Sequence, residues 1–267
     1  MTVILALSGS AAALPAAYVY GSLKSMLPAE QPSGFDRYSQ DYDSYLNQAL
    51  AKTGEDKDYF ATGRAQWLAR CLRELRVTPA SVLDFGCGIG TAAPLLLPHL
   101  GCRSVIGVDP SSASIERARE LHPDSQFQFF RSQDFPSRGE LDCAYCNGVF
   151  HHIPLVERPA ALGFIREALR PGGIFGFWEN NPWNPGTQYV MSRCAFDEDA
   201  VKISPIAARH MLRRAGFEVL RTDFLFFFPR ALAALRWLEP SLRKIPLGGQ
   251  YQVLCRKPGA NASSAKA

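Results

Sequence analysis

The chain has 267 residues, of which 47% are hydrophobic and 20% charged, a balance that excludes a disordered or fibrous protein and fits a globular one with a core. The formal net charge is +4, which is too small to indicate a nucleic-acid partner. The charge is uneven, because residues 202–257 hold eleven Lys or Arg against three Asp or Glu and the rest is mildly acidic.

The first 23 residues carry no charged side chain, which raises the alternatives of a signal peptide or a membrane span. The apolar run at 3–7 is short, is interrupted by small residues and Pro15, and has no Lys or Arg before it. We therefore expect residues 1–34 to be a poorly ordered or loosely packed extension, with Met26 as an alternative start. At the other end, residues 258–267 are small and polar and predict a flexible tail.

Between these ends, strand and helix patterns alternate. Helices are predicted at 56–76, 91–97, 111–121, 159–169 and 205–215, and strands at 81–85, 104–109, 127–131, 141–147, 174–178, 217–228 and 251–256. Ser111 or Ser112 is the expected N-cap of the third helix. This alternation predicts an α/β fold with a doubly wound parallel sheet, whose last two strands pair antiparallel at one edge.

Seven cysteines are scattered through the chain. Cys143 and Cys146 form a CxxC, but no second pair has zinc-ligand spacing, and both lie in a predicted buried strand that points them to opposite faces. We expect no metal site. An odd number of unpaired cysteines favours a reducing, cytoplasmic compartment.

The segment "VLDFGCGIG" (82–90) ends the first predicted strand, where doubly wound sheets bind ligands. Its glycines, Gly86, Gly88 and Gly90, are not spaced as G-x-G-x-x-G, the pattern of a nicotinamide dinucleotide site. Asp84 precedes them, and its carboxylate would repel a pyrophosphate but attract the ammonium of an amino acid. Both features argue against a dinucleotide.

Acidic residues also follow the next two predicted strands. Asp109 ends the second, where a carboxylate can accept hydrogen bonds from both ribose hydroxyls; NAD and S-adenosylmethionine sites share this feature. Asp134, after the third strand, can accept the exocyclic amine of an adenine, while Phe135 packs on the adenine face. Together they indicate a nucleoside ligand.

The chain resembles the class I S-adenosylmethionine-dependent methyltransferase family of the small-molecule type. Besides "VLDFGCGIG", the matching segments are "IGVDPS" (106–111), "SQDF" (132–135), "CNGVFHHI" (146–153) and "LRPGGIFGFWE" (169–179). The resemblance covers residues 35–257 and implies a Rossmann-like seven-stranded sheet with the last strand antiparallel. Residues 35–46 resemble the amino-terminal helix that closes over the cofactor.

The resemblance also implies roles in binding S-adenosylmethionine. Asp84 and the loop Gly86-Cys87-Gly88-Ile89-Gly90 would hold the methionine part, Asp109 with its neighbour Pro110 the ribose, and Asp134 with Phe135 the adenine. Asn147 would lie beside the methionine end and the sulfonium.

Three residues are candidates for the chemistry of transfer. His151 and His152 follow the fourth strand, and an imidazole suits proton removal near neutral pH. The alternative is that one caps the next helix and the other packs in the loop. Glu179 leaves the fifth strand toward the same cleft, where it could orient a histidine, contact the acceptor or simply be solvated.

Two long connections are predicted to border the acceptor site. Segment 180–200 contains Trp183 and Tyr189, and segment 229–249 is basic. The latter is either a cap that packs its leucines on the sheet or a platform for an anionic or lipid-linked acceptor or an acidic membrane surface.

The function expected is methyl transfer from S-adenosylmethionine to a small-molecule or lipid-linked acceptor, with no nucleic acid involved. The alternatives are an NAD-dependent oxidoreductase and a non-catalytic S-adenosylmethionine-fold binding module. "NGVF" (147–150) differs from the [DNS]-P-P-[YFW] motif of amino-methylating DNA enzymes.

Overall fold

A computed structural model describes residues 53–193 and 200–259. The expected extension 1–34, the expected helix at 35–46 and all but the first two residues of the tail lie outside the described residues. Everything below concerns the described part of the chain.

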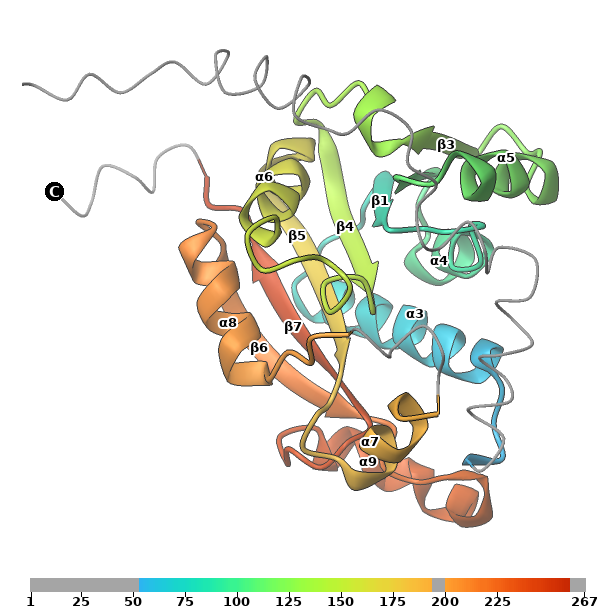
Figure 1. Cartoon of the computed structure of the whole chain (residues 1–267), viewed down its shortest axis with the longest axis vertical. Helices are drawn as coiled ribbons and strands as arrows, with labels where there is room; N and C mark the ends of the chain where they lie inside the picture. Colours follow the sequence, from blue (N-terminus) through green and yellow to red (C-terminus); the bar gives the residue numbers. More distant parts are fainter. Residues whose placement is uncertain (1–52, 194–199, 260–267) are drawn as a thin grey trace, which may run out of the picture. The chain divides into compact units, whose positions relative to one another are not determined.

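The described residues form a seven-stranded sheet (Figure 1). Its strands are β1 (Ser81–Phe85), β2 (Ser104–Asp109), β3 (Phe127–Arg131), β4 (Leu141–Asn147), β5 (Leu169–Asn180), β6 (Glu218–Leu225) and β7 (Gln250–Arg256). The order is β3-β2-β1-β4-β5-β7-β6, with β7 antiparallel to both β5 and β6 and the remaining pairs parallel. This confirms the predicted fold class.

Helices cover both faces of the sheet. The core on one face joins α3 (Lys57–Glu74), α4 (Ala93–Leu100) and α5 (Ser112–Leu121) to the strands, and the core on the other joins α6 (Arg158–Ala168) and α8 (Pro205–Arg214). The predicted cap of α5 is confirmed, since the Ser111 hydroxyl accepts the Ser114 N–H at 3.1 Å. Shorter helices follow β5 and β6: α7 (Pro185–Met191), the 3-10 segment η5 (Arg230–Leu238) and α9 (Glu239–Leu242).

Alternation along the strands builds both cores. Cys143 packs in the core beside α3 and α4, whereas Cys146 packs in the core beside α6, so the CxxC cysteines point to opposite faces as predicted. Burial raises the pKa of both thiols. Among the described residues no cluster of three or more His, Cys, Asp or Glu side chains is arranged to bind a metal. No helix within 53–193 or 200–259 combines the length and apolarity needed to cross a bilayer.

Three predicted boundaries differ from the structure. Strand β5 begins at Leu169 rather than at 174, and residues 170–173 bulge out between the paired positions Leu169 and Ile174. Strand β6 ends at Leu225 rather than at 228, because Phe226 adopts a positive φ of 63°. Segment 180–200, predicted as a long connection, contains the short helix α7.

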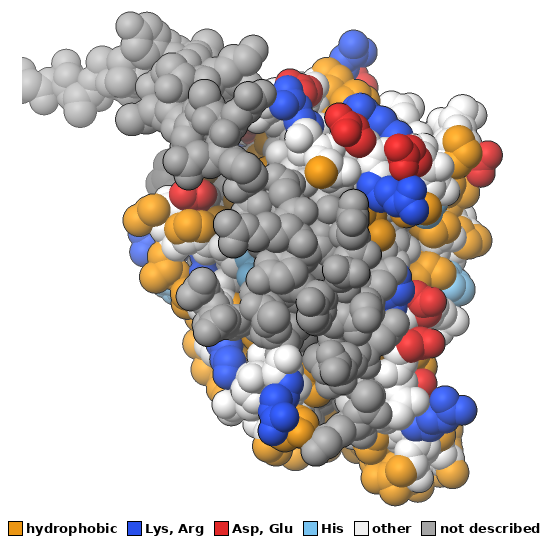
Figure 2. All heavy atoms as spheres, turned by 45° about the vertical axis from the view of Figure 1, so that its right-hand side comes forward, with side chains coloured by type: hydrophobic (Ala, Val, Ile, Leu, Met, Phe, Trp, Pro, Cys, Tyr) orange, Lys and Arg blue, Asp and Glu red, His pale blue; other side chains and the backbone are white. Residues whose placement is uncertain are grey.

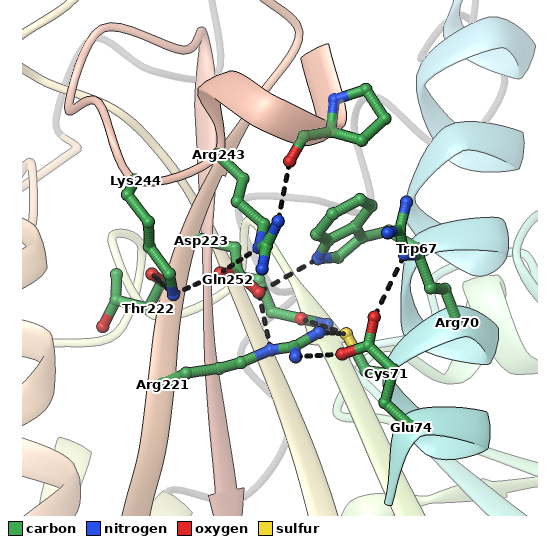
Figure 3. A network of polar contacts seen from close by, with 11 residues as sticks. Trp67, Arg70, Cys71, Glu74, Arg221, Thr222, Asp223, Arg243, Lys244 and Gln252 are labelled. Atoms are coloured by element: carbon green, nitrogen blue, oxygen red, sulfur yellow. Dashed lines mark hydrogen bonds and ion pairs between the residues drawn. The ribbon is translucent and has the colours of Figure 1, made fainter. Parts of the chain in front are cut away.

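A polar network ties α3 to β6 and to the segment after it (Figure 3). Fully buried Asp223 accepts from Trp67 Nε1 at 3.3 Å, and it pairs with Arg221 Nε and Lys244 Nζ, both at 2.7 Å. Arg221 continues the network to Glu74 on α3. The network therefore fixes α3, β6 and the end of the 229–249 segment together, and these elements border the site.

Candidate functional site

The site lies where the strand order changes direction. Strand β1 has β2 on one side and β4 on the other, which makes the carboxyl ends of β1 and β4 the switch point at which such sheets bind ligands. The glycine loop follows β1 there. Gly86, Gly88 and Gly90 have φ of 72°, 52° and 80°, a region that side-chain-bearing residues rarely adopt.

The three glycines have different surroundings. A Cβ at Gly86 would lie 2.4 Å from Val149 Cγ2, and one at Gly90 would lie 2.9 Å from the Phe129 ring. A Cβ at Gly88 would meet no atom within 4 Å. Gly86 and Gly90 thus let Val149 and Phe129 pack directly against the loop backbone. Gly88 instead faces open space, where a ligand can approach the backbone.

Asp84 has an unusual environment for a carboxylate. It is 3% exposed, and its Oδ2 has no hydrogen-bond partner among the described residues. Burial, reinforced by the nearby Asp109, raises its pKa to about 7, and Arg64 opposes this rise. A buried carboxylate oxygen without a donor fits the ammonium group of a ligand.

Asp109, at the end of β2, already holds the glycine loop. Its Oδ2 accepts the Gly88 N–H at 3.0 Å, and its Oδ1 accepts the Ser111 N–H at 2.9 Å. Each carboxylate oxygen has a second lone pair for a hydroxyl. The structure therefore brings Asp84, the glycine loop and Asp109 together at one switch point.

The other predicted cofactor residues lie in different surroundings. Asp134 ends the short helix η3 (Ser132–Asp134), and its half-exposed carboxylate pairs with Arg131 Nε at 2.7 Å. The Phe135 ring is 9% exposed and packs against Phe130 and Phe164, with centroids 5.9 and 5.6 Å away. It leaves little surface for an adenine.

Cys87 and Pro110 contribute no polar side-chain group to the site. The Cys87 side chain is buried in the core beside α4, where burial raises the pKa of its thiol. Its Sγ donates to the Gly88 carbonyl at 3.5 Å, and its own carbonyl accepts the Gly90 N–H at 2.9 Å. Pro110 is exposed at the start of the turn into α5.

The candidate catalytic residues meet at the carboxyl ends of β4 and β5, with Glu179 inside β5 and the two histidines in the loop after β4. His151 Nδ1 lies 2.6 Å from Glu179 Oε2, and the His151 N–H donates to Glu179 Oε1 at 3.3 Å. Both side chains are buried, 4% and 1% exposed. The His152 ring lies 4.0 Å from that of His151, centroid to centroid. Of the interpretations left open for Glu179, the geometry supports orientation of a histidine.

A cavity of about 530 Å³ opens beside these residues. Asn147 lines it from the end of β4, and His151 and His152 line it from the loop that follows. Residues of α3, of α7, of the turn after β6 and of the start of β7 complete the lining. Because it also contains Phe60 and Phe226–Phe228, we call it the aromatic cavity. Its volume lies within the range of sites for drug-sized ligands.

Arg64 is a site residue that the sequence did not indicate. From α3 it lines the aromatic cavity, lies near Asp84, and donates to Tyr145 Oη and Gln250 Oε1, both at 3.0 Å. The sequence does contain a pattern that could have indicated it: Arg64 lies four residues after Phe60 and four before Leu68, on the otherwise apolar face of the predicted helix. A buried guanidinium there suits a ligand carboxylate.

The basic segment 229–249 contains three cations that pair with carboxylates of the protein. Arg236 pairs with Glu55 at 2.8 Å and stacks 4.4 Å from the Tyr59 ring centroid, while Arg243 and Lys244 face Asp223. These cations hold the segment in place. The leucines expected to pack on the sheet do not all do so: Leu232 and Leu235 are 47% and 38% exposed. Figure 2 shows hydrophobic side chains gathered at the lower end of this face, the end where Figure 1 places α9.

The fold is that of an α/β protein with a ligand-binding switch point, and the aromatic cavity opens beside that point. Residues 55–237 match the methyltransferase domain family. The chain belongs to this family, and it is a class I S-adenosylmethionine-dependent methyltransferase. This assignment replaces the oxidoreductase and the non-catalytic binding module left open by the sequence.

Three relatives illustrate the similarity. Trans-aconitate 2-methyltransferase of Escherichia fergusonii is 26% identical over 188 residues, 66% of this chain and 74% of the relative. Sterol 24-C-methyltransferase of Kluyveromyces lactis is 28% identical over 159 residues, 54% of this chain and 42% of the relative. The methyltransferase solved in complex with the Haloferax volcanii activator Trm112 shares the fold, with a TM-score of 0.60 and 18% identity over 86% of this chain and 100% of that one.

Proposed function

We propose that this methyltransferase acts on a small molecule bound in the aromatic cavity, and that His151, oriented by Glu179, takes up the proton that the acceptor releases. The observation that carries the proposal is the buried His151–Glu179 pair, with 2.6 Å between Nδ1 and Oε2, in the wall of that cavity. The two curated relatives are named for acting on trans-aconitate and on a sterol, which supports a small-molecule acceptor.

The residues at the switch point fit S-adenosylmethionine. The unpartnered Asp84 Oδ2 would accept the ammonium of the methionine part, and Arg64 would bind its carboxylate. The open space over Gly88 admits the ligand next to the backbone, and Asp109 would accept the ribose hydroxyls. Asp134 would accept the adenine amine, although the position of Phe135 in the core gives less support to its packing on the adenine.

S-adenosylmethionine supplies a methyl group on a sulfonium, and its sulfur keeps the electron pair of the broken carbon–sulfur bond. The chain's part is alignment and proton transfer. Alignment of the two reactants can supply roughly 7–11 kcal/mol of the barrier. A lone pair of the acceptor atom forms the new bond to carbon, and the proton lost by that atom passes to the His151 imidazole.

Glu179 is a positioning residue in this scheme. In this scheme its carboxylate accepts a hydrogen bond from the Nδ1–H of His151, so that the imidazole lone pair lies on Nε2. The negative charge of Glu179 then stabilises the imidazolium once it forms. The backbone bond from His151 to the same carboxylate fixes the orientation further.

The test is the rate of methyl transfer in His151→Gln, Glu179→Gln and the neighbouring control His152→Gln. Turnover of His151→Gln should fall by on the order of 10²–10⁴-fold with unchanged affinity for S-adenosylhomocysteine. Glu179→Gln should also shift the pH dependence of turnover, which a purely structural role would not do. Equal, small losses in the two histidine variants would refute the role of His151.

Two finer expectations remain proposals. The six described cysteines are buried thiols, which supports a cytoplasmic location.

Three exposed apolar side chains of segment 229–249 support contact with a bilayer: Leu232, Leu235 and Trp237. The basic side chains of the same segment give less support to an anionic acceptor or an acidic membrane surface, because Arg236, Arg243 and Lys244 already form ion pairs. Sedimentation with neutral and anionic vesicles tests this, and the absence of binding to either would refute membrane contact.

A further inference from the structure

Five of the aromatic side chains in the wall of the aromatic cavity come from two parts of the chain. Tyr59 and Phe60 come from the first turn of α3, and Phe226, Phe227 and Phe228 follow β6. The Phe226 ring meets Phe60 and Tyr59 edge-on, with centroids 5.0 and 5.9 Å apart. These edge-on contacts are a preferred geometry of aromatic pairs and stabilise the wall.

The turn that carries the three phenylalanines is held in an unfavourable backbone conformation. Phe226 has a φ of 63°, which is uncommon for a bulky residue. The Glu239 carboxylate accepts the N–H groups of Phe226, Phe227 and Phe228 at 3.2, 3.2 and 3.1 Å. Three consecutive N–H groups around one carboxylate form a strong anion-binding turn, which offsets the cost at Phe226.

Glycines on the neighbouring segments make room for this turn. A Cβ at Gly63 would lie 2.7 Å from the Phe226 ring, and one at Gly248 would lie 2.5 Å from the Leu225 carbonyl oxygen. The Gly249 N–H also donates to the Phe226 carbonyl at 3.0 Å. Strained conformations that several independent features maintain tend to occur where they serve a site. Here they aim a rigid apolar surface into the cavity.

The charged groups of the cavity do not suit a polyanion. Among the described residues that line the cavity, the basic side chains are Lys57 and Arg64, and the acidic side chain is Glu55. Arg64 donates to Tyr145 and Gln250, and Glu55 pairs with Arg236. A tricarboxylate would bring several charges to this wall, and buried charges require partners.

Resting on the proposed function, we propose that the acceptor is an apolar molecule with a planar ring system, which lies against the Phe226–Phe228 wall and presents its nucleophilic atom to His151. The apolar wall and the few charged side chains of the cavity suit such a ring system better than a small acid. The relatives are named for acting on trans-aconitate and on a sterol. The cavity of this chain is therefore suited to an apolar ring system, as in a sterol, rather than to a polyanion.

The test measures binding by calorimetry to the full chain saturated with S-adenosylhomocysteine. The probes are phenol, 2-naphthol and 2-anthrol as planar hydroxylated rings, trans-aconitate as a polyanion, and 1-decanol as an apolar chain. The fused rings should bind at least ten-fold more tightly than trans-aconitate and decanol. Equal or tighter binding of trans-aconitate or decanol would overturn the proposal, and so would the absence of binding by every ring compound.

Phe228 provides the variant, because it lines the cavity but belongs to neither buried core. Phe228→Ala should weaken binding of the fused rings about 10- to 150-fold, the range for one buried aromatic side chain. Phe228→Leu should restore only part of this affinity, because an aliphatic side chain lacks the aromatic face.

The matched control is Trp237→Ala, which removes a 75% exposed aromatic side chain outside the cavity wall. If Phe228→Ala loses no more affinity than Trp237→Ala, the proposal is wrong. Failure of the wild-type chain to bind S-adenosylhomocysteine in the first titration would instead contradict the proposed function. A thermal melt of each variant with that ligand shows separately whether it folds.

Discussion

Replacing Asp84 by Asn should stabilise the ligand-free protein at pH 8 and abolish most of its affinity for S-adenosylhomocysteine. The carboxyl is fully buried, and its pKa rises from 3.8 to about 7. Because the pKa is raised in the folded state, the contribution of Asp84 to stability is greatest below the pKa of the unfolded chain and is lost as the pH rises from about 4 to about 7.

The magnitude follows from this rise. At 1.36 kcal/mol per pH unit, a rise of about three units corresponds to on the order of 4 kcal/mol lost by the wild type at pH 8. The new amide would leave a buried donor unsatisfied, which costs about 1–3 kcal/mol. We therefore expect a net gain of about 1–3 kcal/mol for Asp84→Asn at pH 8 and a net loss at pH 4.

Urea unfolding of both proteins at pH 4, 6 and 8 measures the difference in free energy, and calorimetry measures binding. Wild-type affinity for S-adenosylhomocysteine should fall about ten-fold per pH unit below pH 7, since the neutral carboxyl attracts an ammonium less. A stability difference that is independent of pH, or affinity that Asp84→Asn leaves unchanged, would refute the role of Asp84.

Three further substitutions test the structure around the site. Gly86→Ala should prevent cofactor binding and lower the melting temperature, because its Cβ would overlap Val149. The control Gly163→Ala has open space at its Cβ inside α6, so it should leave binding unchanged and should not lower the melting temperature. An equal drop in the two melting temperatures would contradict this. Asp223→Ala should lower the free energy of unfolding in urea by about 1–3 kcal/mol. This loss is smaller than that for a fully buried ion pair, because Lys244 is exposed to solvent. An unchanged free energy would show that the network of Figure 3 does not hold α3 to β6. Arg236→Glu should lower the melting temperature, since it places a second carboxylate beside Glu55. An unchanged melting temperature would show that the Arg236–Glu55 pair does not stabilise the fold.

The sequence predicts the fold well because strand alternation and loop glycines are local signals. All seven predicted strands exist, and β1 to β4 have the predicted bounds. The sequence does not predict where β6 ends, because the turn at Phe226 depends on Glu239, thirteen residues further along the chain. The bulge in β5 likewise depends on its pairing with β4.

The same distinction applies to the site. Motif positions indicate Asp84, Asp109 and the glycine loop, because each lies at or directly after the carboxyl end of a strand. The contact of His151 with Glu179 spans 28 residues, so the sequence leaves several roles open for the acid. Arg64 and the aromatic wall come from α3 and the β6 turn, which only the folded sheet brings to the carboxyl end of β4.

The most direct measurement is a calorimetric titration of the full chain and of Asp109→Ala with S-adenosylhomocysteine and with NAD. The wild type should bind S-adenosylhomocysteine and not NAD. Asp109→Ala should lose about 1.5–3 kcal/mol of binding energy, as expected for a charged hydrogen-bond partner, and Asp109→Asn, which keeps one acceptor oxygen, should lose less. Binding of NAD without S-adenosylhomocysteine, or unchanged affinity in Asp109→Ala, would contradict the placement of the cofactor at this switch point.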